Sequence, residues 1–121
     1  MKLLAERLPK EIRERLLEKI KTLELEKRPH FQLRMAEKGI TWHEVDGALR
    51  SQTLKLIEAH DEVGTRRLLV RDTKGTCVVV DIDTKELVTT YKNSSGDNHS
   101  TLNRSVYFQG QLSWGILKKW A

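Results

Sequence analysis

The sequence has one cysteine and no long apolar run. A single cysteine cannot form a disulfide within the chain, which is typical of proteins from a reducing compartment. Charged residues interrupt the N-terminal segment every few positions, so it lacks the continuous apolar core of a secretory signal peptide. No stretch approaches the roughly 20 apolar residues of a membrane span. We therefore expect a cytoplasmic protein without a membrane partner.

The motifs of cofactor and metal chemistry are missing as well. The sequence contains no glycine-rich phosphate loop, no CxxC pair and no HExxH motif, and its four histidines lack the spacing of metal ligands. The cysteine, Cys77, lies in the apolar run 77–80, where burial is expected and nucleophilic chemistry is not. The sequence therefore predicts neither a metal nor a cofactor.

Positive charge is present in excess. The 22 lysine and arginine residues outnumber the 17 acidic residues, which gives a net charge of +5 and a pI near 9.5. Such an excess favours an anionic partner such as nucleic acid. The excess is modest, so a solvated surface of mixed charge is the alternative.

The length of 121 residues is that of a single domain.

Apolar residues recur every three or four positions in the first segment, which is the pattern of an amphipathic helix. We expect this helix within residues 1–25, with Pro9 near its start. Acidic and basic residues alternate on its outer face, which favours solvent over a membrane surface. The apolar face comprises Leu4, Leu8, Ile12, Leu16, Ile20 and Leu23.

Two shorter helices are expected between residues 29 and 50. Pro29 suits the first position of one helix, and Gly39 suits the left-handed residue that ends it. Phe31 should face the core. In the next helix Thr41 and Glu44 form a capping box, in which each side chain bonds the backbone N–H of the other.

From residue 54 the apolar period changes to that of strands. Short connections between the strands favour an antiparallel meander. We therefore expect a single α+β domain, 1–121, in which N-terminal helices pack on a four-stranded antiparallel sheet within residues 29–92. The expected strands are 54–59, 66–71, 76–82 and 87–92, and residues 93–121 form a polar loop and an aromatic tail.

The densest group of reactive side chains lies where the last strand meets the polar loop. RNA cleavage by attack of the 2′-hydroxyl needs a base, an acid and cations that stabilise the phosphorane. Histidine transfers protons near neutral pH and lysine can stabilise the phosphorane, so His99 and Lys92 are candidate catalytic residues. An ordinary polar loop is the alternative. Residues that could contact RNA are Thr90, Tyr91, Asp97, Ser100, Arg104 and Tyr107.

A second pair of candidate catalytic residues lies on the helix that begins at Pro29. His30 and Arg34 are about one helical turn apart and could both point over the sheet. The alternative is structural: His30 packs beside Pro29, and Arg34 pairs with Glu37 or Glu26.

Residues 30–41 resemble the opening of the small bacterial and phage domains labelled DUF4258, which begin with a histidine, an arginine and a basic-Gly-Ile/Val-Ser/Thr helix junction. Residues 88–91 resemble the last strand of that family, and the resemblance covers roughly residues 30–91. The family is similar to the barnase, EndoU, colicin and RelE group of ribonuclease folds, which cut RNA without a metal. The resemblance implies that His30, Arg34 and Thr89 or Thr90 would act on RNA.

Two functions follow as hypotheses. The first is a metal-independent ribonuclease or toxin-like RNA-binding protein, with an antitoxin or immunity partner if it is toxic. The second is a non-catalytic phage or mobile-element protein that binds and inhibits a host protein complex. Its first helix and aromatic tail would then be the interaction surfaces. The tail could also join copies of the chain in a homo-oligomer.

Overall fold

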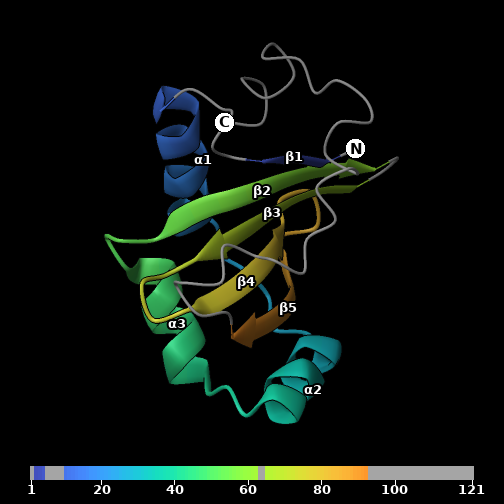
Figure 1. Ribbon diagram of the computed structural model, residues 1–121. Coiled ribbons are helices and arrows are strands. Elements are labelled where there is room, and N and C mark those ends of the chain that lie inside the picture. Colours follow the sequence, from blue (N-terminus) through green and yellow to red (C-terminus); the bar gives the residue numbers. More distant parts are fainter. Residues whose placement is uncertain (1, 5–9, 63–64, 93–121) are drawn as a thin grey trace.

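The computed structural model describes residues 2–4, 10–62 and 65–92, with the side chains of 10–59 and 66–92. Three helices precede a meander of four antiparallel strands, so the predicted α+β class is confirmed (Figure 1). The elements are β1 (Lys2–Leu4), α1 (Lys10–Thr22), α2 (Pro29–Lys38), α3 (Trp42–Arg50), β2 (Lys55–Glu62), β3 (Thr65–Arg71), β4 (Thr76–Asp81) and β5 (Glu86–Lys92).

The N-terminal segment departs from the prediction. Residues Lys2–Leu4 form β1 instead of helix, and β1 pairs antiparallel with β2, which makes a five-stranded sheet in the order β1-β2-β3-β4-β5. The described part of helix α1 runs from Lys10 to Thr22. Leu4 fits the helical spacing of α1, but pairing with β2 decides its conformation, because tertiary contacts override local propensity.

The capping signals of α2 and α3 are confirmed. Pro29 begins α2, and Gly39 follows it with a φ of 66°, in the left-handed region. At the start of α3 the Glu44 N–H donates to Thr41 Oγ1 at 3.2 Å, and the Thr41 N–H donates to Glu44 Oε1 at 3.3 Å. The capping box therefore fixes the first turn of α3 and the position of the Glu44 carboxylate.

One side of the sheet, which we call the core face, carries the hydrophobic core. All three helices contribute large buried side chains to a single cluster there. In Figure 1, α1 and α3 lie behind the sheet, and α2 lies beyond β5, against which it packs. The cluster includes Leu16 of α1, Phe31 of α2, Val45 of α3, and Leu68, Val70, Val78 and Val80 of the sheet.

The opposite side, which we call the polar face, carries most of the charged side chains of the strands. Strand side chains alternate between the two faces, so Tyr91 points to the polar face while its neighbours Thr90 and Lys92 point to the core face. One row of the polar face crosses β2 to β5 and contains Lys55, Arg71, Cys77 and Tyr91. The next row contains Glu58, Leu69, Val79 and Thr89, and the third includes Arg67 and Asp81.

Candidate functional site

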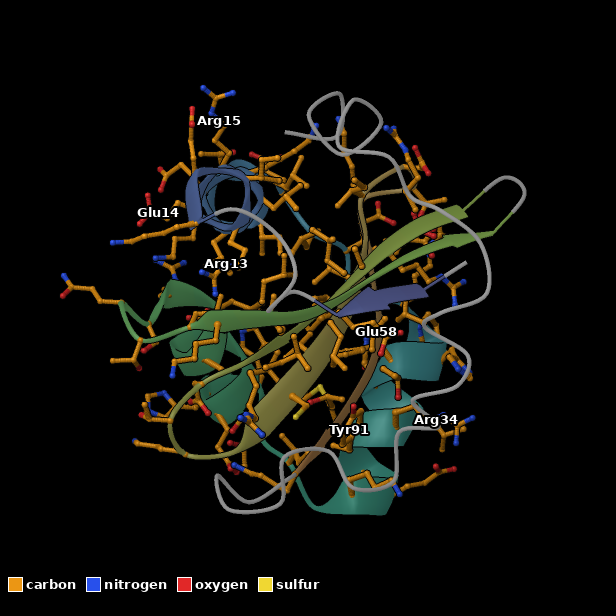
Figure 2. The ribbon with its side chains drawn as sticks, turned by 45° about the horizontal axis from the view of Figure 1, so that its top comes forward. Arg13, Glu14, Arg15, Arg34, Glu58 and Tyr91 are labelled. Carbon is orange, nitrogen blue, oxygen red and sulfur yellow. The ribbon has the colours of Figure 1, made fainter. Side chains whose placement is uncertain are left out.

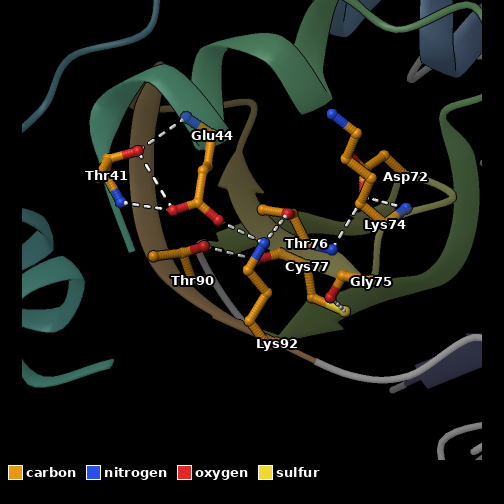
Figure 3. Close-up of polar contacts among 9 residues, drawn as sticks. All are labelled: Thr41, Glu44, Asp72, Lys74, Gly75, Thr76, Cys77, Thr90 and Lys92. Atoms are coloured by element: carbon orange, nitrogen blue, oxygen red, sulfur yellow. Dashed lines mark hydrogen bonds and ion pairs between the residues drawn. The ribbon is translucent and has the colours of Figure 1, made fainter. Parts of the chain in front are cut away.

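Lys92, a predicted catalytic residue, lies on the core face and has two partners. Its Nζ lies 2.6 Å from Glu44 Oε2 and donates to Thr76 Oγ1 at 2.7 Å (Figure 3). The hydrogen bond from Lys92 is the main cause that lowers the pKa of Glu44 below its ordinary value, and the Thr41 N–H adds to this effect. Sequence reasoning missed Glu44 as a partner. The ion pair between Glu44, a residue of the capping box, and Lys92 thus connects the start of α3 to the end of β5.

Thr90, predicted to contact RNA, is fully buried on the same face. Its Oγ1 donates to the Cys77 carbonyl oxygen at 2.7 Å (Figure 3). A buried hydroxyl with a backbone partner offers RNA no surface, which corrects that prediction. Nearby, the Asp72 carboxylate accepts from the Thr76 N–H at 2.8 Å and the Lys74 N–H at 3.1 Å. These contacts close the turn between β3 and β4, so the network is structural.

His30 and Arg34 lie on α2, and the structural alternative is the one observed for Arg34. Its Nη1 donates to Glu37 Oε2 at 3.0 Å. His30 is exposed in the first turn of the helix. Lys92 pairs with α3 instead of α2. Among the described side chains, no hydrogen bond or ion pair brings His30, Arg34 and Lys92 together.

The other predicted site residues lie outside the described residues, and the roles assigned to them stay predictions. They are the catalytic candidate His99 and the RNA-contact candidates Asp97, Ser100, Arg104 and Tyr107.

Tyr91 is the predicted RNA-contact residue that lies partly exposed on the polar face. Figure 2 shows it on the same side of the sheet as Glu58. Burial raises the pKa of the Tyr91 hydroxyl, and Cys77 and Glu58 raise it further, so the hydroxyl stays protonated at neutral pH. Burial also raises the pKa of the Cys77 thiol to about 11. Cys77 is therefore a poor nucleophile, as its apolar setting predicts.

Two arginines of the polar face have a buried nitrogen atom without a hydrogen-bond partner. These atoms are Arg71 Nη1 and Arg67 Nε. Arg67 Nε lies 3.5 Å from Asp81 Oδ2, which is close enough for an ion pair but lacks hydrogen-bond geometry. A buried donor costs about 1–3 kcal/mol when no protein group, water or ion supplies an acceptor. Sequence reasoning missed both arginines, although alternation along β3 places them on one face.

Residues 10–59 and 66–92 are the part of the chain whose side chains the structure describes. No group of three or more His, Cys, Asp or Glu side chains in this part of the chain is arranged to hold a metal ion. None of the described helices combines the length and apolar character needed to cross a membrane.

Comparison with protein-family models, curated proteins and solved structures gave no match. The resemblance to DUF4258 domains therefore stays a prediction, and function has to be argued from the chemistry of the site. The row of Lys55, Arg71, Cys77 and Tyr91, which we call the basic row, places two cations and an aromatic ring on one side of a rigid sheet.

Proposed function

We propose that the protein binds RNA through the basic row of the polar face. The observation that supports this most directly is Arg71 Nη1, which is buried and has no hydrogen-bond partner. The guanidinium fork matches phosphate geometry, so a phosphate oxygen would supply the missing acceptor once the Arg71 side chain turns this nitrogen toward solvent. The net charge of +5 favours the same class of partner.

Tyr91 supplies the second element of the proposed site. Unpaired RNA bases stack on aromatic side chains, and a sheet holds such side chains on a rigid surface. Only Cys77 separates Tyr91 from Arg71 across the sheet, and neighbouring strands lie about 4.8 Å apart. A phosphate bound by Arg71 and a base stacked on Tyr91 would therefore belong to one nucleotide or to two neighbours.

RNA cleavage has less support than RNA binding. Arg34 and Lys92 are engaged in ion pairs, and Lys92 lies on the opposite face of the sheet from Tyr91. A cleavage reaction at the basic row would need a proton donor and acceptor from elsewhere, for which the sequence offers His99. We keep cleavage as a prediction that is measured beside binding.

Binding can be measured by fluorescence anisotropy with a labelled single-stranded RNA of mixed sequence, in EDTA and at several salt concentrations. Arg71→Ala should weaken binding about tenfold for every sequence and lower the salt slope by about one. Tyr91→Leu keeps an apolar side chain but removes the ring, and should cost about 1–3 kcal/mol of binding free energy. The matched control is Arg50→Ala, which removes the same charge from an exposed ion pair on α3. Equal losses in the Arg50 and Arg71 variants would contradict a site at the basic row.

The same proteins incubated with total RNA in EDTA test cleavage. Cleavage that is lost in His30→Ala or His99→Ala would support a ribonuclease and identify which group of residues acts. Tight binding with intact RNA would limit the function to binding. If the wild type neither binds nor cleaves RNA, the proposal fails, and inhibition of a host protein complex becomes the hypothesis to test.

A further inference from the structure

Two side chains of the basic row place like charges next to each other. Lys55 and Arg71 are directly opposite in the register of β2 and β3, and both point to the polar face. Their Cβ atoms are expected about 5 Å apart, and like charges in this position destabilise a sheet. In the third row, by contrast, Arg67 pairs with Asp81. Among the described residues, Lys55 and Arg71 have no ion pair, so two adjacent positive charges lack a carboxylate partner there.

The surroundings of these two cations favour one phosphate over a run of phosphates. The next row contains the buried carboxylate of Glu58. Burial, then Cys77 and Glu58, raise the pKa of the Tyr91 hydroxyl, so the charge of Glu58 reaches the basic row. This charge would repel a second phosphate placed over its own row. On the other side β3 ends at Arg71, and the turn to β4 follows.

The basic row has a single aromatic ring. Tyr91 lies on β5, the last strand of the sheet, against which α2 packs. The other aromatic side chains that the structure describes lie elsewhere. Phe31 belongs to the core cluster, and the ring of Trp42 faces the Lys27 ammonium, 4.1 Å from the ring centroid. The described part of the polar face therefore offers a stacking surface for one base.

We propose that the basic row binds the terminal nucleotide of an RNA strand whose end carries a phosphate monoester. Such a group carries close to two negative charges at neutral pH and has three acceptor oxygens, whereas a phosphate within the strand carries one charge. The Arg71 fork suits two of these oxygens, and the Lys55 ammonium suits the third. The terminal base would stack on Tyr91. The inference rests on the proposed RNA binding and adds which part of the RNA is bound.

The test compares RNA ends. Fluorescence anisotropy would be measured with a short single-stranded RNA that carries a phosphate or a hydroxyl at one end and the dye at the other, in separate pairs for the 5′ and 3′ ends. A phosphate at one of these ends should tighten binding about tenfold. Equal affinity for phosphate and hydroxyl at both ends overturns the inference, and RNA binding stands if Arg71→Ala still weakens it. Absence of binding to every RNA overturns the proposed function as well.

Substitution of Lys55 shows whether the basic row recognises the end. Lys55 is exposed, so Lys55→Met removes the charge without disturbing the core. It should lower the preference for the phosphate end to about twofold or less, and Lys55→Arg should keep it. The matched control is Lys21→Met, at an exposed lysine in the last turn of α1, which should leave the preference unchanged. A preference that survives Lys55→Met, or that disappears in Lys21→Met, overturns the inference.

Discussion

Thr76, Thr90 and Lys92 lie on the core face of the sheet, and the polar group of each side chain has a partner there. Arg67 and Arg71 lie on the other face of the same strands, and each has a buried nitrogen atom without a hydrogen-bond partner. The described residues thus provide partners for these three core-face groups, whereas one nitrogen of each of the two arginines has none, and neither does Arg13 Nε on α1. Because buried donors in folded proteins nearly always have acceptors, Arg71 Nη1 is the group of the polar face that a water, an ion or a ligand would satisfy.

The two faces also differ in their apolar contacts. On the core face three helices and four strands share one cluster. On the polar face Leu69 and Val79 share a row with Glu58 and Thr89, and the rows on either side carry charged side chains. The folding energy of the domain is therefore expected to come mainly from the core face, which leaves the polar face available for binding.

Leu68 and Leu69 provide the sharpest test of this comparison, because they are the same residue type on opposite faces of β3. Leu68 is in the core cluster and Leu69 is not. Leu68→Ala should lower the free energy of unfolding by about 3–5 kcal/mol, and Leu69→Ala by only about 1–2 kcal/mol. Urea unfolding of the two variants checks this difference. Equal losses would mean that both faces carry the core.

The capping box of α3 should have the next largest effect. Thr41→Ala removes the side-chain acceptor for the Glu44 N–H and should cost about 1 kcal/mol of unfolding free energy. Thr22→Ala is the matched control, since the exposed Thr22 hydroxyl only donates to the Lys19 carbonyl at the end of α1. A loss in the control as large as in Thr41→Ala would show that the cap has no special role.

Acid should weaken the core-face network through Glu44. The pKa of Glu44 is lowered in the folded protein, chiefly by the Lys92 hydrogen bond. Its contribution to stability is therefore present above the ordinary carboxyl pKa of 4.5 and is lost as the pH falls through the lower folded value. Glu44→Gln should flatten this part of the pH profile, measured as the urea midpoint from about pH 3 to about pH 7.

Two features keep the test specific. Asp83 also has a lowered pKa, mainly through its hydrogen bond with Arg66, so some acid sensitivity should remain in Glu44→Gln. Glu14→Gln, on the exposed face of α1, is the control. If the two variants have the same pH profile as the wild type, Lys92 does not stabilise Glu44 in solution.

Local signals explain what the sequence predicted well. Pro29, Gly39 and the Thr41 capping box act within a few residues, and they mark the ends of α2 and α3 correctly. Strand β1 was missed because its pairing with β2 joins residues more than fifty positions apart, while Leu4 fits a helical spacing. Local patterns do not report such distant pairing.

The candidate site shows the same division between local and distant signals. Alternation along β5 was sufficient to separate Tyr91 from Thr90 and Lys92, but the prediction grouped all three by their position in the sequence. The Lys92 pair with Glu44 and the unpartnered nitrogen of Arg71 depend on how helices and strands meet, which the sequence alone did not reveal.

The smallest stability effect is expected at Arg71, and its matched comparison is Lys92. Lys92→Met leaves Glu44 and Thr76 without their shared cation and should cost up to about 1 kcal/mol, because the pair is partly exposed. Arg71→Met removes a donor that has no partner, so the free energy of unfolding should change by less than about 0.5 kcal/mol or rise. Urea unfolding measures both variants. A loss for Arg71→Met equal to that for Lys92→Met would show that Arg71 is already satisfied in the folded chain, and the argument for an anion at the basic row would then fail.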